Sequence, residues 1–403
     1  MATAIQHTVE LTTDTYRELA PARRILAELE QETVTRQVEI AQIAAPTGAE
    51  RRRALWVADR FRDAGLRARH DDAGNVIAHA AGAYAGAPVV VCAHLDTVFP
   101  ADTDLVVRRD GRRLVGPGIC DNGRGLAVML TIANVLRQCG DVLARAVEFV
   151  ATTGEEGCGD LGGARHYLAR GARPPLAVIA IDGAGDERIV NTGLGSRRFR
   201  VTFTGPGGHS WSAYGTPNPV HAASRAAAAL STLRLRGTGR STLTVSRIGG
   251  GMSINAIPED AWFEVDARST DGVALSRLES ELRTHAVSAA AEENQSRTIG
   301  TAPLCVQIQR IGERPPGETR ADAPLVTAAR EATRLVGRTP ELATASTDAN
   351  AAMALGVPAI AIGGGGAGGD AHSSREWFDG TTSVAGMERA LTIIATMARV
   401  AAD

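Results

Sequence analysis

Clusters of acidic and histidine residues recur along the chain, and most of them directly follow an apolar stretch. The five clusters are His94-Leu95-Asp96, residues 116–122 with Asp121, Glu155-Glu156, Asp182-Gly183 and Asp370-Ala371-His372. In an α/β sheet, ligands bind at the carboxyl ends of parallel strands, so side chains that follow several strands meet at one edge. That many carboxylates at one edge would repel one another, and divalent cations would make the arrangement stable. The pattern therefore predicts a metal site.

The stretches that carry these clusters have the pattern of buried strands alternating with helices. Short apolar runs at residues 88–93, 146–151, 176–181 and 358–362 are typical of strands buried on both faces. Helical periodicity is expected at residues 16–44, 49–64, 124–139, 161–170, 325–336 and after 384. Such alternation predicts an α/β domain with a mixed, largely parallel sheet.

From residue 197 onward the pattern changes to polar and apolar residues in alternation, as in a sheet with one wet face. Strands are expected at 197–204, 241–248, 261–268 and 304–311, with helices at 219–235 and 273–293. This β-α-β-β-α-β order is that of a ferredoxin-like α+β unit. We therefore predict one domain formed by residues 1–194 and 312–403, interrupted by an inserted domain at 195–311.

Composition excludes several classes of protein. The 403 residues are 44% hydrophobic and 22% charged, which is the balance of a globular protein and not of a disordered one. A net charge of −2 without a basic block does not favour nucleic-acid binding, and no apolar run approaches a membrane span. Five cysteines without a C-x-x-C pair, and no evident secretory signal, favour a reducing compartment. We expect a cytoplasmic protein with no nucleic-acid or membrane partner.

The order of these motifs resembles the M20 family of metallopeptidases. The resemblance rests on His94-x-Asp96, the glycine-rich loop ending in Asp121, Glu155-Glu156, Asp182 and His372, and in the insert on residues 207–210, 255–258 and 265–268. Residues 347–350 and 360–372 are most similar to the peptidase T-like branch. The resemblance covers nearly the whole chain. It implies a catalytic domain of the zinc-exopeptidase type, with the insert as a lid or dimerisation domain.

The resemblance also implies a metal centre with two divalent ions, zinc in the first place and manganese or cobalt as alternatives. Asp121 would bridge the ions, His94 and Asp182 would complete one shell, and Glu156 and His372 the other. Among the catalytic residues, Asp96 would accept the second ring N–H of His94 and fix its tautomer. Glu155 would act as general base, on a turn made possible by glycines at 154 and 157. The bond after the bridging aspartate is commonly cis in this family, so the resemblance also implies a cis bond between Asp121 and Asn122.

Three residues of the insert are the expected substrate-binding residues. By resemblance, His209 would stabilise the oxyanion, often from a partner subunit, while Asn255 and Arg268 would hold a substrate carboxylate or backbone. A homodimer formed through the insert is expected for the same reason. Without the resemblance, Arg268 would be read as part of a strand-end salt bridge.

The expected function is hydrolysis of C–N bonds in small peptides, as an aminopeptidase or dipeptidase. One alternative keeps the site but removes an acyl, carbamoyl or amino group from a non-peptide small molecule or an N-acyl amino acid. Another is a binding protein that retains the fold without catalysis. Cys120 and Cys158 flank the ligand loops and are read as inert thiols or, less favoured, as thiolate ligands.

Overall fold

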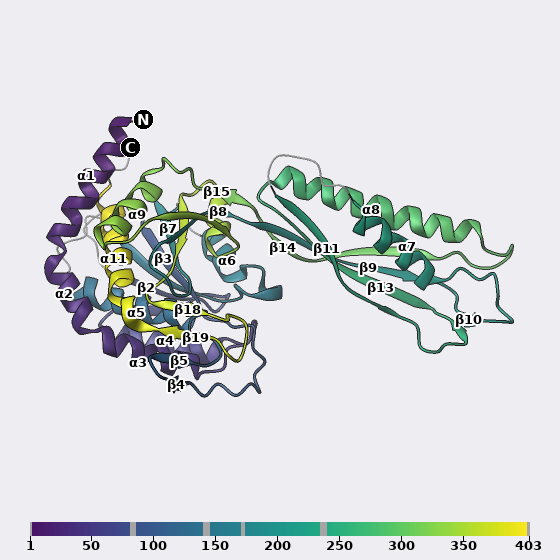
Figure 1. The fold of residues 1–403 in the computed structure, drawn as a ribbon, viewed down its shortest axis with the longest axis horizontal. Coiled ribbons are helices and arrows are strands. Elements are labelled where there is room, and N and C mark those ends of the chain that lie inside the picture. The colour runs from purple at the N-terminus through teal and green to yellow at the C-terminus, as the bar shows by residue number, and fades with distance from the viewer. Residues whose placement is uncertain (1, 81–85, 140–145, 171–173, 234–239, 401–403) are drawn as a thin grey trace. The chain divides into compact units, whose positions relative to one another are not determined.

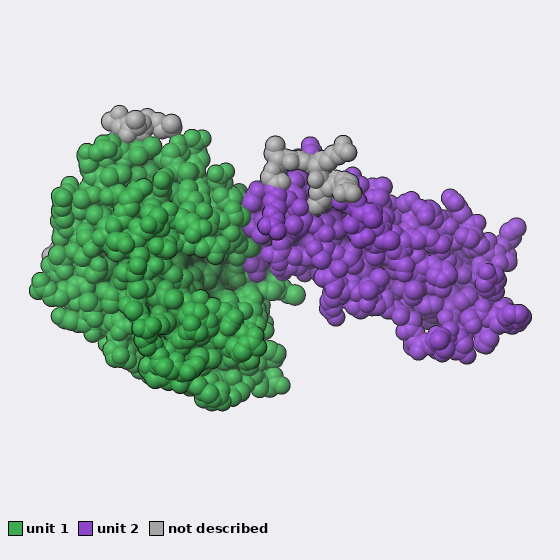
Figure 2. Space-filling view, in the orientation of Figure 1, with its two compact units in different colours: residues 1–193, 317–403 green, residues 194–316 purple. Residues whose placement is uncertain are grey.

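The protein is described by a computed structural model that covers residues 2–80, 86–139, 146–170, 174–233 and 240–400. It divides into two compact units (Figure 2). Unit 1 consists of Met1–Gly193 and Gly317–Asp403, and unit 2 of Leu194–Pro316. No helix among the described residues is long and apolar enough to cross a membrane.

The central sheet of unit 1 runs in the order β1-β2-β6-β3-β7-β17-β8-β15, with β16 paired to β8. The strands are β1 (Arg67–His70), β2 (Val76–Ala80), β3 (Val89–His94), β6 (Val147–Thr152), β7 (Ala177–Ile181), β8 (Arg188–Gly193), β15 (Gly317–Glu318), β16 (Glu341–Ala345) and β17 (Ala359–Ile362). Strands β6, β3, β7 and β17 are mutually parallel, and the flanking pairs are mostly antiparallel. The predicted mixed, largely parallel sheet is confirmed.

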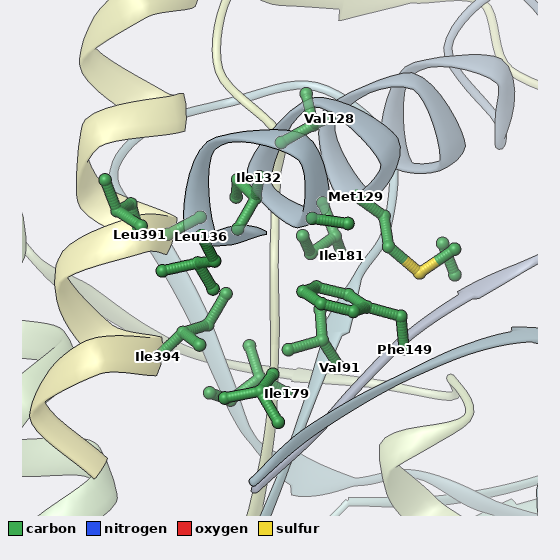
Figure 3. Close-up of a cluster of buried hydrophobic side chains, with 14 of the residues drawn as sticks. Val91, Val128, Met129, Ile132, Leu136, Phe149, Ile179, Ile181, Leu391 and Ile394 are labelled. Atoms are coloured by element: carbon green, nitrogen blue, oxygen red, sulfur yellow. The ribbon is translucent and has the colours of Figure 1, made fainter. Parts of the chain in front are cut away.

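Helices cover both faces of this sheet, which is why its inner strands are apolar throughout (Figure 1). On one face, Val91 and Phe149 pack with Ile132 of α5 (Gly123–Gln138) and Ile394 of α11 (Ser383–Arg399), as Figure 3 shows. Helix α9 (Pro324–Leu335) and α4 (Arg51–Asp63) belong to the same core. The opposite face packs against α6 (Gly162–Arg170) and α10 (Ala349–Met353). This packing fixes the parallel strands, and with them the edge where the acidic clusters lie.

The single helix predicted for residues 16–44 is wrong. The structure has three helices there, α1 (Ala2–Glu18), α2 (Ala20–Glu28) and α3 (Glu30–Ala41). The breaks fall at Leu19 and Leu29, whose ψ values of 4° and 0° leave the helical region. Leu19 is fully buried at its break. Apolar periodicity continues through both breaks, so the sequence pattern does not reveal that the chain changes direction.

A second, small sheet of unit 1 was not predicted. Its order is β18-β19-β5-β4, formed by β18 (Ala367–Gly369), β19 (Trp377–Asp379), β5 (Arg113–Val115) and β4 (Arg108–Asp110). All pairs are antiparallel. The pairing of β19 with β5 joins the segment that contains His372 to the segment that leads into Asp121.

Unit 2 is a four-stranded antiparallel sheet with two helices. The strands β9 (Gly195–Thr204), β11 (Ser241–Gly250), β13 (Asp260–Ser269) and β14 (Cys305–Arg314) lie in the order β11-β13-β9-β14. Their inward residues form a core with α7 (Pro219–Ser231) and α8 (Gly272–Gln295). Burial alternates along β13, as expected for a sheet with one covered face. The strand order is that of a ferredoxin-like unit.

Candidate metal centre

Three neighbouring parallel strands deliver three of the predicted ligands to one edge of the central sheet. His94 is the last residue of β3, Asp182 directly follows β7, and Glu156 follows β6 after a short turn. Asp121 comes from the loop that leads into α5, and His372 from the loop between β18 and β19. The shared direction of β6, β3 and β7 therefore brings His94, Glu156 and Asp182 to the same edge of the sheet.

Asp121 lies between the two histidines. Its Oδ1 is 3.0 Å from Nε2 of His94, and its Oδ2 is 3.1 Å from Nε2 of His372. Oδ1 of Asp182 lies 3.7 Å from Nε2 of His94, and Oε1 of Glu156 lies 2.8 Å from Nε2 of His372. The five predicted ligands therefore form two sets that share the Asp121 carboxylate.

The donor atoms fit divalent cations. His94, Asp121 and Glu156 each offer a donor atom within 4.8 Å of the other two. Imidazole nitrogen together with carboxylate oxygen is a ligand mixture that catalytic zinc and related ions accept. The His94 side chain is 3% exposed and that of His372 is 52% exposed, so one side of the cluster is open to solvent.

The electrostatics of the ion-free cluster indicate how strongly it attracts positive charge. The hydrogen bonds to Asp121 and Glu156 raise the pKa of His372 to about 10. Burial lowers the pKa of His94, but hydrogen bonds to Asp121 and neighbouring carboxylates outweigh burial and raise that pKa well above its usual value. Without metal the cluster thus recruits protons, and metal binding must displace them because imidazole binds metal in its neutral form.

The Asp96 carboxylate holds the turn that carries Glu155 and Glu156. Its Oδ1 accepts the backbone N–H of Glu155 at 3.0 Å, and its Oδ2 that of Glu156 at 2.9 Å. The turn itself uses Gly154 and Gly157 at φ values of 62° and 52°, a conformation that glycine adopts without strain. Two backbone hydrogen bonds thus fix the direction of both glutamates.

Asp96 faces the second ring nitrogen of His94 with both its backbone carbonyl and its carboxylate. The His94 Nδ1 lies 3.0 Å from the backbone carbonyl oxygen of Asp96 and 3.6 Å from its Oδ1. The carbonyl is thus the nearer acceptor for the second ring N–H, and the carboxylate is engaged by the Glu155-Glu156 turn and by Thr47 Oγ1 at 2.8 Å. Burial raises the pKa of Asp96, but its contacts with His94 outweigh burial and lower it.

The profile of peptidase family M20/M25/M40 matches residues 90–400. The chain belongs to this family. It is therefore a metal-dependent hydrolase of peptide or amide bonds, and the resemblance seen in the sequence motifs is confirmed.

Solved structures with the same fold cover nearly the whole chain. The aminopeptidase PepT from Bacillus cereus ATCC 10987 matches with a TM-score of 0.72 and 20% identity, over 92% of this chain and 99% of that one. The YxeP protein of Bacillus subtilis, described as a dinuclear metal-binding peptidase of the M20 family, matches with a TM-score of 0.66 and 17% identity, over 92% and 98%. An amidase of the hydantoinase/carbamoylase family from Burkholderia vietnamiensis matches with a TM-score of 0.67 and 20% identity, over 93% and 97%.

In this M20 hydrolase, two of the expected substrate-binding residues lie side by side in unit 2. His209 belongs to β10 (Gly208–His209), which pairs with β12 (Ala256–Ile257), and the backbone N–H of Ser210 donates to the carbonyl of Asn255 at 3.0 Å. His209 and Asn255 are both exposed. The N–H of Trp211 donates to His209 Nδ1 at 3.2 Å, so in the neutral ring Nε2 carries the proton.

Arg268 does not lie near these two residues. Arg268 lies near one end of β13, where it pairs with Ser196 of β9. The other end of β13 begins at Asp260, which pairs with Thr204, and this is the end close to β10 and His209 (Figure 1). Arg268 is eight steps along the strand from Asp260, which is roughly 27 Å. Arg268 forms an ion pair with Asp266, with Nε 2.6 Å from Oδ2. Unit 2 therefore separates the predicted substrate-binding residues into two groups.

Several residues around the site were missed by sequence reasoning. Glu376 is fully buried beside Asp121, and burial raises its pKa to about 7. Asn122 Oδ1 accepts the N–H of Gly183 at 3.1 Å, next to Asp182, and this contact was not predicted, whereas the cis bond between Asp121 and Asn122 was expected and is present. The buried Arg53 donates to the carbonyl of Leu95 at 2.8 Å. Glu376 and Arg53 left no signal in the sequence, because their partners are backbone groups of any residue type.

The two cysteines near the ligand loops differ in environment. Cys120 is buried, its Sγ donates to the carbonyl of Trp377 at 3.2 Å, and burial raises the pKa of its thiol. A thiol with a raised pKa resists the deprotonation that metal ligation requires, so the inert interpretation is favoured. Cys158 is exposed, in the short 3-10 helix Gly157–Gly159 that follows Glu156.

We predict that Asp96→Asn retains the fold but lowers the hydrolytic rate by about 10- to 100-fold, the usual effect of losing a group that orients ligand residues. The amide keeps one acceptor oxygen, so it can hold only one of the two glutamate N–H groups. Rates and metal content are measured together. Asp271→Asn is the control, because Asp271 caps α8 by accepting the N–H of Val273 in unit 2. Wild-type rates in Asp96→Asn would contradict the role.

Proposed function

We propose that this M20 hydrolase cleaves the amide bonds of short peptides at a pair of divalent metal ions, as an aminopeptidase or dipeptidase. The observation that carries the proposal is the position of Asp121, with one carboxylate oxygen toward each histidine. A carboxylate placed in this way can bridge two cations. The similarity in fold to the aminopeptidase PepT, and to a peptidase described as dinuclear, supports the class of substrate and the number of ions.

The proposed ligands are His94, Asp182 and Asp121 for one ion, and His372, Glu156 and Asp121 for the other. Zinc is the first choice for this mixture of donors, with manganese or cobalt as alternatives. When bound, such a pair supplies Lewis acidity for the scissile carbonyl and lowers the pKa of a water molecule. The protein holds these ligands in two sets that share the Asp121 carboxylate.

Glu155 is the proposed general base. It is 4% exposed and directly precedes the ligand Glu156, on the turn held by Asp96. A carboxylate in that place can take the proton from the attacking water and pass it to the leaving amine. Asp96 supports this step because it fixes the backbone of the turn and so keeps the Glu155 carboxylate directed at the water. Proton transfer depends on that geometry, and a small displacement of the base slows it.

His209 is proposed to stabilise the oxyanion in the metal centre of a second copy of the chain. A tripeptide is about 10 Å long, far shorter than the separation between Arg268 and the His209 end of unit 2. One copy therefore cannot bring both residues to the same small substrate. The Nε2–H of His209 faces away from the Trp211 contact, and it is the donor that a developing oxyanion needs.

A homodimer through unit 2 is proposed for the same reason. Among the residues that the structure describes, β11 is an edge strand ten residues long, paired within its sheet only to β13. Four exposed apolar side chains, Trp211, Tyr214, Met252 and Ile254, lie around His209 and Asn255. Such residues in one region are typical of a surface that a partner covers. A second copy is the simplest partner, because most homo-oligomers are two-fold symmetric.

A second candidate function is hydrolysis of a non-peptide amide, an N-acyl amino acid or a carbamoyl group. The similarity to an amidase of the hydantoinase/carbamoylase family, at the same identity as the PepT match, favours it. The metal centre would be unchanged, and contacts outside it would select the substrate. We also propose a cytoplasmic location, supported by five free cysteines.

We predict that Glu155→Gln keeps its metal and fold but loses about 10²- to 10⁴-fold in hydrolytic rate, the contribution typical of a general base. The assay uses tripeptides, dipeptides, N-acetyl amino acids and N-carbamoyl amino acids with the wild type and the variant. Cleavage confined to the acylated or carbamoylated compounds would overturn the peptidase assignment.

The control for this variant is Glu148→Gln, the same change on β6. Glu148 accepts a hydrogen bond from the Tyr167 hydroxyl at 2.5 Å. It pairs with Val90 of β3, four residues before the ligand His94 on that strand, and so lies away from the metal centre. It should behave as the wild type. A Glu155→Gln enzyme that retains wild-type turnover at equal metal content refutes the general-base role.

We predict that His209→Ala and Glu155→Gln, each inactive alone, restore activity when unfolded together and refolded as a mixture. Half of the dimers are then mixed, and each has one site with both residues intact, so about a quarter of wild-type activity returns. Molar mass in solution is measured alongside. Dimers that form but recover no activity would show that His209 acts within its own chain or not at all.

A further inference from the structure

The Glu376 carboxylate is surrounded by backbone N–H groups of the loop that carries Asp121. Its Oε1 accepts the N–H of Cys120 at 2.7 Å and of Asp121 at 2.8 Å, and its Oε2 accepts that of Gly118 at 3.0 Å. In addition, its backbone carbonyl accepts the N–H of Gly116 at 2.9 Å. One residue thus satisfies most of the donors of this loop.

The loop needs such an acceptor because it has no regular structure of its own. Residues 116–122 lie between β5 and α5, and Gly118 has a φ of 69°. Buried N–H groups without partners are unfavourable, so a loop at a buried site must find acceptors elsewhere in the fold. With both oxygens engaged by N–H groups, the Glu376 carboxylate is directed at the backbone and is not placed as a sixth ligand.

Glu376 and His372 touch the same loop from one short segment. His372 reaches the Asp121 side chain, with Nε2 3.1 Å from Oδ2, while Glu376 holds the Asp121 backbone. The pairing of Trp377 with Val115 then joins the two segments through β19 and β5. The carboxylate of Asp121 and the imidazole of His372 are therefore fixed relative to each other at three points.

We propose that Glu376 is a positioning residue that sets the direction of the Asp121 carboxylate, and hence the affinity for both metal ions. The inference rests on the proposed ligand roles of Asp121 and His372. An apolar side chain could fill the same space without the cost of burying a carboxylate. The carboxylate is instead matched to three N–H groups whose positions determine where the Asp121 side chain begins.

The test is the affinity for zinc of Glu376→Gln, measured by competition with a chelating dye, together with the visible absorption spectrum of the cobalt-loaded protein. The glutamine side chain keeps its size but has an NH₂ group where one N–H donor needs an acceptor. We expect zinc binding to weaken by about 10- to 100-fold, the usual effect of removing a group that orients a ligand. The cobalt bands should shift, because the ligand geometry changes.

Glu148→Gln serves as the matched control and should bind zinc as the wild type does. Unchanged affinity and an unchanged cobalt spectrum in Glu376→Gln would overturn the proposal. A lower melting temperature of the metal-free protein with wild-type zinc affinity would overturn it too, since the role would then be structural only. If Glu376→Gln does not fold, Glu376→Asp, which keeps the charge on a shorter side chain, takes its place. A wild type that binds no metal would instead refute the proposed function.

Discussion

The metal centre depends on side-chain oxygens that accept hydrogen bonds from the backbone of the ligand loops. Asp96 holds the N–H groups of the Glu155-Glu156 turn, Glu376 holds that of Asp121, and Asn122 holds that of Gly183 beside Asp182. These loops follow strands or precede a helix, so their N–H groups lack partners in regular structure. The acceptors supply those partners and, in doing so, fix the points from which the ligand side chains start.

Charge is the second constraint. The ligand carboxylates lie close together at the edge of an apolar sheet, and their repulsion must be balanced. Protons on the two histidines provide part of the balance without metal, as the raised pKa of His372 indicates. The fully buried Arg53 adds permanent positive charge beside Asp96, while donating to the backbone carbonyl of Leu95. A pair of divalent ions completes the balance in the proposed enzyme.

The sequence was sufficient to predict the parallel strands, because strands buried on both faces are apolar throughout and the acidic clusters follow them directly. It did not reveal the break at Leu19, where periodicity continues although the chain turns. The small sheet was also missed, since strands of three residues show no pattern. Glu376 could not be recognised, because its partners are backbone groups without a residue type. The separation of Arg268 from His209 depends on strand register, which a motif does not encode.

The number of metal ions bound per chain tests the bridged centre most directly. Protein loaded with zinc, freed of excess ion by gel filtration and analysed by mass spectrometry should hold two ions per chain. Asp121→Ala should lose both, since the two sets share that carboxylate, whereas His372→Ala should lose one and keep the other. One ion per wild-type chain, or two ions retained in a folded Asp121→Ala protein, would contradict the bridged centre.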